Sequence, residues 1–123
     1  MLCPAYLQSM PIFFYYATLA TANPAIMAAQ KEVGVVQGSS AVLEVYISGY
    51  PMPHTADQIR WHRPGGYIVM ESDEGVEFRE GRRILVLSDL QPQQAGMYMC
   101  EVELSHQRRA SACIQLDIYG KSL

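Results

Sequence analysis

Short runs in which hydrophobic and polar residues alternate fill the chain from about residue 33 onward. In the clearest run, residues 41–47, one face carries Ala41, Leu43, Val45 and Ile47, and the other carries Val42, Glu44 and Tyr46. A period of two residues is typical of a half-buried β-strand. Gly and Pro separate the runs, and no segment after residue 30 has the 3.6-residue period of an amphipathic helix. The pattern therefore predicts an all-β domain.

The same pattern predicts further short strands along the chain. They are expected at residues 33–36, 59–61, 67–70, 76–78, 85–90, 98–104 and 112–118. With residues 41–47 this makes about eight strands, a number that two packed sheets accommodate.

Residues 1–30 differ in kind from the rest, because they contain no Asp, Glu, Lys or Arg. An apolar run at residues 11–19 precedes Ala20-Thr21-Ala22, which fits the small-residue cleavage pattern of a signal peptide. We expect a signal peptide over residues 1–22, a linker over 23–31, the domain over 32–120 and a tail over 121–123. The segment begins without a basic side chain, so an uncleaved anchor and a plain hydrophobic extension stay open.

The stretch Leu90 to Cys100, LQPQQAGMYMC, is the most informative motif. A turn containing Pro92 and Gly96 follows Leu90, and then Tyr98 and Cys100 share one face of a strand. Together with Trp61 and residues 38–53, GSSAVLEVYISGYPMP, this stretch resembles the immunoglobulin superfamily, in particular its I-set subclass. The resemblance covers residues 33–119.

The resemblance implies an immunoglobulin-like β-sandwich of two antiparallel sheets with Greek-key connections. It also implies that the hydroxyl of Tyr98 bonds to upstream backbone. The residues expected to define the core and its corner are Val45, Trp61, Leu85, Leu87, Leu90, Gly96, Tyr98 and Cys100.

Two positions depart from the family pattern. Val45 stands where the family has the Cys that pairs with Cys100, so the disulfide between the sheets cannot form. A bridge across about 56 residues would contribute roughly 4 kcal/mol, of which Val45 recovers roughly 1–2 kcal/mol by packing against Trp61. Gln94 stands where the family has an Asp, which weakens an ion pair with an Arg.

Three interpretations of the remaining cysteines stay open. Cys100 faces the core, and the period of the last strand places Cys113 on the outer face. Cys100 is then an inert buried thiol with Cys113 free, or the two form a disulfide through a shifted register, or Cys113 bridges two chains.

The composition argues against catalysis and nucleic-acid binding. The net charge is −3, too small for a nucleic-acid partner. His54, His62 and His106 lack the spacing of metal ligands, and no nucleophile motif or glycine loop before a helix occurs. We therefore expect no enzyme activity, no cofactor, no bound metal and no small-molecule substrate.

Charged clusters are the candidates for binding a partner protein. They comprise Arg60, His62 and Arg63 near one strand, Arg108 and Arg109 at a hairpin tip, and the acidic residues Glu71, Asp73 and Glu74. Complementary charge would guide contact with another protein or with a second copy of this one.

The resemblance and the leader together favour a secreted or cell-surface binding module of adhesion or receptor type, attached to a membrane only through a missing or separate anchor. The alternative is an intracellular structural I-set domain of a muscle or cytoskeletal protein. The missing Cys at Val45 favours the alternative, whereas the leader opposes it.

Overall fold

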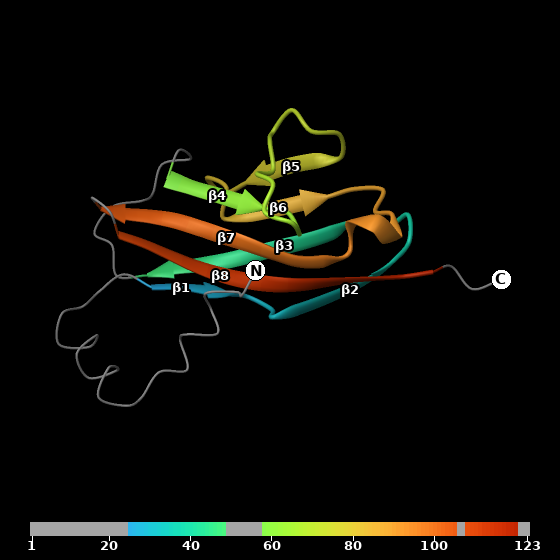
Figure 1. The fold of residues 1–123 in the computed structure, drawn as a ribbon, viewed down its shortest axis with the longest axis horizontal. Helices are drawn as coiled ribbons and strands as arrows, with labels where there is room; N and C mark the ends of the chain where they lie inside the picture. The colour runs from blue at the N-terminus through green and yellow to red at the C-terminus, as the bar shows by residue number, and fades with distance from the viewer. Residues whose placement is uncertain (1–24, 49–57, 106–107, 121–123) are drawn as a thin grey trace.

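The protein is a sandwich of two β-sheets. The computed structural model describes residues 25–48, 58–105 and 108–120, so the expected signal peptide and tail lie outside the described residues. Eight strands form two sheets of four that pack face to face (Figure 1). The predicted all-β, immunoglobulin-like fold class is confirmed.

Both sheets join strands that are distant in sequence, as Greek-key connections require. The first sheet has the order β1 (Ala25–Ala28), β3 (Ala41–Ser48), β6 (Ile84–Leu87), β5 (Val76–Arg79), and all its pairs are antiparallel. The second has the order β2 (Glu32–Val36), β8 (Arg108–Tyr119), β7 (Gly96–Ser105), β4 (Ile59–His62). Within it β2 runs parallel to β8, and the other pairs are antiparallel.

The start of the domain differs from the prediction. β1 lies within residues 23–31, where the sequence predicts a linker. The sequence pattern missed this strand because the four-residue run Ala25–Ala28 is too short to show a period. Its Ile26 is buried in the core. The chain then crosses to the other sheet as β2, which matches the strand predicted at residues 33–36, so β1 is an additional strand that the sequence did not predict.

The strand predicted at residues 67–70 is wrong. Only an isolated bridge joins His62 to Ile68, and the chain then turns back, because the Asp73 carboxylate accepts hydrogen bonds from the backbone N–H of Met70 and from Arg63. The second sheet therefore ends at β4.

The core lies between the two sheets and follows the predicted alternation. Val45, Trp61, Leu85, Leu87, Leu90, Tyr98 and Cys100 all belong to one buried cluster. The indole N–H of Trp61 donates a 2.7 Å hydrogen bond to the carbonyl of Arg82, so its polar atom is satisfied inside the core. No charged side chain is buried among the described residues.

The turn before β7 fixes how the chain crosses between the sheets. A 3₁₀ helix, η3 (Pro92–Gln94), follows the buried Leu90, and the Tyr98 hydroxyl donates a 2.7 Å hydrogen bond to the carbonyl of Gln94. At Gly96 φ is 142°, and a Cβ atom there would lie 2.7 Å from the Pro64 ring. Only glycine fits this position without displacing Pro64.

The structure corrects the interpretation in which Cys100 and Cys113 form a disulfide. Cys100 is a free, buried thiol. In the β7–β8 register it stands opposite Ala112, and Cys113 stands opposite Met99 on the other side of the sheet, because successive residues of a strand face opposite ways. The predicted outward orientation of Cys113 is thereby confirmed. The first interpretation is therefore confirmed for Cys100, which is a buried free thiol, and wrong for Cys113, which is not free.

Candidate functional site

The outer surface of β4, β7 and β8 gathers several of the residues predicted for partner binding. The registers place Arg60 beside Glu101, His62 beside Met99, and Glu103 beside Arg109. Ile68 joins the row because its bridge to His62 puts both side chains on one side of the sheet. We call this surface the open face; it comprises Arg60, His62, Ile68, Met97, Met99, Glu101, Glu103 and Arg109.

One carboxylate lies at the centre of the charged part of the open face. An oxygen of Glu101 lies 3.7 Å from Nε2 of His62 and 3.8 Å from Nη1 of Arg109. Both distances are too long for hydrogen bonds, and Nε2 of His62 has no hydrogen-bond partner. Arg60 and Glu103 are exposed and form no ion pair with any described residue. The charges of this face are therefore only loosely engaged with one another.

Apolar side chains border the charged part of the open face. Ile68 is 47% exposed and Met97 is 44% exposed, and the buried Met99 lies on the same side of the sheet. Charged residues next to exposed apolar ones are typical of the rim and centre of a protein-binding surface. The arrangement offers both charged and apolar contacts to a protein.

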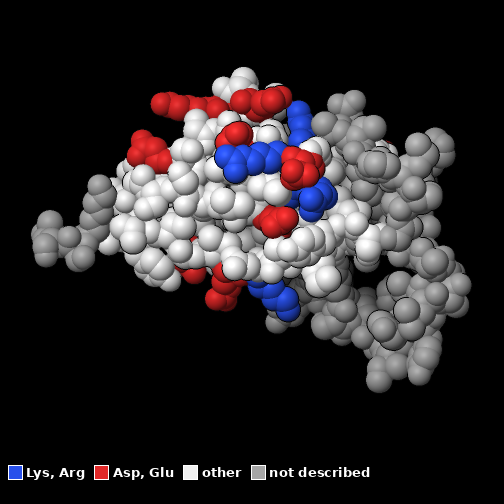
Figure 2. Space-filling model, turned by 180° about the vertical axis from the view of Figure 1, so that it is seen from behind, with Lys and Arg blue, Asp and Glu red and all other residues white. Residues whose placement is uncertain are grey.

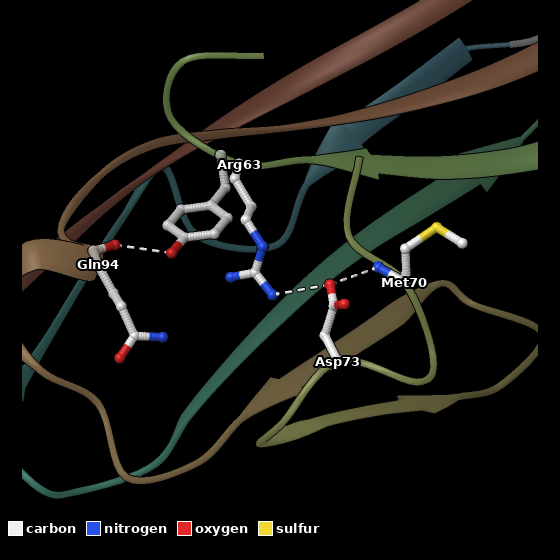
Figure 3. Close-up of polar contacts among 5 residues, drawn as sticks. Arg63, Met70, Asp73 and Gln94 are labelled. Carbon is white, nitrogen blue, oxygen red and sulfur yellow. Dashed lines mark hydrogen bonds and ion pairs between the residues drawn. The ribbon is translucent and has the colours of Figure 1, made fainter. Parts of the chain in front are cut away.

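Arg63 does not belong to this surface, although the sequence groups it with Arg60 and His62. It follows β4 and forms a 3.2 Å ion pair with Asp73, whose carboxylate also accepts a 2.9 Å bond from the Met70 backbone (Figure 3). The Met70 hydrogen bond, followed by Arg63, lowers the pKa of Asp73 below its ordinary value. The pair therefore ties the loop after β4 to the turn at residues 70–73.

The corner tolerates Gln94 in place of Asp because the amide serves locally. The side-chain oxygen of Gln94 accepts a 2.8 Å hydrogen bond from the backbone N–H of Gln91, and the backbone carbonyl of Gln94 accepts a hydrogen bond from the Tyr98 hydroxyl. Burial raises the pKa of Tyr98, and the nearby Arg63 acts in the opposite direction. The hydroxyl thus stays protonated and able to donate.

The acidic residues between positions 71 and 80 do not form one binding surface. Glu71 lies 3.9 Å from Arg82, Asp73 is paired with Arg63, and Glu74 is exposed without an ion pair to a described residue. The side chain of Arg108 lies outside the described residues. Of the predicted partner-binding residues, the open face brings together Arg60, His62 and Arg109.

The strand period could have found the residues that sequence reasoning missed. Because Tyr98 and Cys100 face inward, Met97, Met99, Glu101 and Glu103 must face outward beside Arg60 and His62. Their grouping with Ile68 depends on the isolated bridge, which no pattern in the sequence predicts.

The outer surface of β3, β5 and β6 carries charges that are engaged with each other. We call it the paired face; its charged residues are Glu44, Glu77, Arg79, Glu80 and Arg83. Arg79 lies 3.0 Å from Glu77, and Arg83 lies 3.7 Å from Glu44 and 4.0 Å from Glu80. Arg83 also donates a 3.1 Å hydrogen bond to the carbonyl of Val45. Figure 2 shows acidic and basic side chains side by side on the surface behind that of Figure 1.

The described part of the chain offers no alternative chemical site. It contains no cluster of three His, Cys, Asp or Glu side chains placed to hold a metal ion. Nor does any helix within it have the length and apolar character to cross a bilayer. Burial raises the pKa of the Cys100 thiol far above its ordinary value, so this cysteine is not a nucleophile at neutral pH.

Several solved structures resemble this one at low sequence identity. The Ig1 domain of mouse SynCAM 2 is 16% identical, with a TM-score of 0.60 over 80% of this chain and 97% of that chain. The complex of titin M10 with an obscurin-like 1 Ig domain includes a chain that is 22% identical, with a TM-score of 0.62 over 82% and 100%. The N-terminal four Ig domains of Dscam1 give 19% identity and a TM-score of 0.58 over 78% and 21%.

At these identities the likenesses show the fold. A family model described as "Immunoglobulin domain" matches residues 23–103, more than half of the chain. The sequence match, the order of the strands and the tyrosine at the corner agree, and the chain belongs to the immunoglobulin-domain family.

Proposed function

We propose that this domain is a protein-binding module of adhesion or receptor type, secreted or displayed at the cell surface, and that its partner docks on the open face. One observation carries the proposal. The open face exposes the apolar Ile68 and Met97 at one end and Arg60 and Glu103 toward the other end, and these two opposite charges have no ion-pair partner among the described residues. Unengaged charges can form new pairs with a partner without first breaking old ones.

The family supports a binding role rather than catalysis. Immunoglobulin-like domains carry binding sites on a common scaffold, so the fold alone does not identify the partner. Proteins with similar structures include SynCAM 2 and Dscam1 as well as titin, which is seen in complex with an obscurin-like 1 Ig domain. The extracellular assignment rests on the hydrophobic leader read from the sequence.

Binding of a tagged, multivalent form of the protein to intact cells tests the proposal. We expect wild-type protein to stain a subset of cell types, and the double variant Arg60→Glu/Met97→Asp to lose at least nine tenths of the signal. The matched control is Tyr46→Asp, which places a charge at an exposed apolar residue of β3 on the opposite side of the sandwich. The proposal would be refuted if the control lost its staining while the double variant kept the staining of the wild type.

An intracellular structural domain is the second candidate, because Val45 replaces the core cysteine and Cys100 is a free thiol. Disulfides persist in oxidising compartments, and a domain without the core disulfide does not need an oxidising compartment to form that bond. N-terminal sequencing of protein expressed in a secretory cell separates the candidates. A start near Asn23 in the medium favours secretion, and an intact Met1 in the cytosol favours the structural domain.

A further inference from the structure

β2 has one edge that no strand of the described residues occupies. It is the last strand of its sheet, and among the described strands only β8 pairs with it (Figure 1). Gln115 N–H donates to the carbonyl of Lys31, and Gln37 N–H donates to the carbonyl of Tyr119, so the odd-numbered residues of this segment bond to β8. Because backbone groups alternate along a strand, those of Glu32, Gly34 and Val36 point to the free edge.

The free edge is well prepared for pairing with another strand. Among the described residues, the Val36 carbonyl alone of its backbone groups has a partner, the N–H of Ser39 at 2.9 Å. Edge strands of soluble proteins are usually guarded by proline, by a bulge or by charged side chains, especially lysine. β2 has no proline, bulge or lysine; its one charged residue is Glu32 at its first position, and glycine occupies its centre.

We propose that two copies of this protein associate by antiparallel pairing of β2 with β2, centred on Gly34. In this register the N–H and C=O of Gly34 bond to the C=O and N–H of Gly34 in the second copy. The N–H of Val36 meets the carbonyl of Glu32, and the N–H of Glu32 meets the carbonyl of Val36, which also accepts from Ser39; the two-fold axis repeats both bonds. The groups left unpaired on one edge are thus matched by those of an identical edge, as a two-fold contact requires.

The side chains of β2 are compatible with this register. Val33 and Val35, which pack partly against the core, would stand opposite each other, and Glu32 would stand opposite Val36. Lys31 would lie opposite Gln37, so no like charges face each other directly across the contact. Directly opposed like charges destabilise a strand pair, and β-branched pairs stabilise it.

Gly34 has a second role at the centre of this contact. A Cβ atom at Gly34 would lie 2.9 Å from the ring of Tyr119, so glycine leaves the room that this exposed ring occupies. Pairing about Gly34 would bring the Tyr119 rings and the exposed Val36 side chains of both copies onto one surface. The contact would therefore bury apolar area as well as forming hydrogen bonds.

Sedimentation velocity of the full chain over a range of concentrations tests the proposal. We expect a monomer–dimer equilibrium for the wild type and at least tenfold weaker dimerisation for Val36→Pro, which removes an edge N–H that has no partner in the monomer. The matched control Val36→Thr keeps the N–H and the branched shape, and should dimerise within twofold of the wild type. A wild type that stays monomeric at millimolar concentration would overturn the proposal, as would a Val36→Pro dimer of unchanged affinity.

Amide hydrogen exchange gives a readout that does not depend on a variant. The N–H groups of Gly34 and Val36 should exchange rapidly in dilute protein and at least tenfold more slowly in concentrated protein. The N–H of Val35, which bonds to β8, should change much less. Equal rates for Gly34 at both concentrations would contradict the pairing even if Val36→Pro failed to fold.

The edge contact can be distinguished from the hypothesis that the charged hairpin tip mediates self-association. Arg109→Glu alters the open face and leaves the edge of β2 intact, so it should not change the dimerisation constant. Loss of the dimer in Arg109→Glu with retention in Val36→Pro would overturn the proposal. The contact does not depend on which surface binds a partner protein, so this test and the cell-binding test can fail separately.

Discussion

The two outer faces of the sandwich hold their charges in different ways. On the paired face, Arg79 donates a 3.0 Å hydrogen bond to Glu77, and Arg83 donates a 3.1 Å hydrogen bond to the backbone carbonyl of Val45. On the open face, Arg60 and Glu103 are exposed without an ion pair to a described residue.

We therefore expect the charges of the paired face to stabilise the fold and those of the open face to be available for binding. Charges that already bond to carboxylates and backbone contribute to the stability of the fold, because removing one leaves its partners unsatisfied. Charges that bond to nothing contribute little to stability and are available to a second protein. The same residue type, arginine, is therefore expected to behave differently at positions 60 and 83.

Both faces belong to sheets that share one core, and the variant Val45→Cys, which tests this, should change the free energy of unfolding more than any other variant considered. Val45 and Cys100 lie in the same buried cluster and belong to opposite sheets. A bridge between them should raise the free energy of unfolding by about 4 kcal/mol under oxidising conditions, from the chain entropy of the closed loop. Chemical denaturation with and without reductant measures the gain.

The control for this variant is Val45→Ser, which cannot form the bridge and should destabilise the protein by about 1–2 kcal/mol through lost apolar burial. Mass spectrometry must show that the bridge has formed in Val45→Cys. A bridged protein that is less stable than the wild type would mean that the two residues do not face each other across the core.

Replacing arginine by methionine on each face tests the expected difference between the two faces directly. Arg83→Met should lower the free energy of unfolding by about 1–2 kcal/mol, because the carbonyl of Val45 loses a charge-assisted hydrogen bond. Arg60→Met should change it by less than about 0.5 kcal/mol, as is usual for an exposed surface residue without contacts. Urea denaturation under identical conditions measures the free energy of unfolding of both variants. Equal losses of stability would contradict the proposed difference between the two faces.

Asp73→Asn has the smallest expected effect and asks whether Arg63 is withdrawn from the open face. The pKa of Asp73 in the folded protein is lower than its ordinary value of 3.8, so the hydrogen bond from the Met70 backbone and the ion pair with Arg63 stabilise the fold above that pH. This stabilisation is lost as the pH falls through the lowered pKa. Between pH 5 and pH 2 the wild type should therefore lose more stability than Asp73→Asn.

The matched control for that measurement is Glu74→Gln, because Glu74 is exposed and forms no ion pair with a described residue. It should follow the acid profile of the wild type. A profile for Asp73→Asn that coincides with both would show that the Arg63–Asp73 pair does not stabilise the folded state.

Much of the fold could be predicted from the sequence because the signal is local. Leu90, Gly96 and Tyr98 lie within one turn and one strand, and their spacing alone implies the corner that the structure contains. The alternation at residues 41–47 likewise matches β3 and its buried face. A period of two can be recognised in the sequence wherever one side of a strand is buried and the other is exposed to solvent.

The parts that could not be predicted depend on contacts between distant segments. Residues 67–70 have the composition of a strand, but Asp73 captures the Met70 backbone and turns the chain away from β4. Arg63 follows Arg60 and His62 in sequence, yet its partner Asp73 lies across a loop, which removes it from the open face. The free edge of β2 follows from the order of the strands in the second sheet, which the sequence pattern does not give.

A methionine footprint of the bound protein tests the central claim most directly, because both faces report in one molecule. Met97 on the open face is 44% exposed, and Met27 of β1, beside the paired face, is 64% exposed, so hydrogen peroxide should oxidise both in the free protein. When the protein is bound to cells, we predict that oxidation of Met97 falls at least fivefold while oxidation of Met27 is unchanged. Protection of Met27 with full oxidation of Met97 would contradict the claim that the open face is the binding surface.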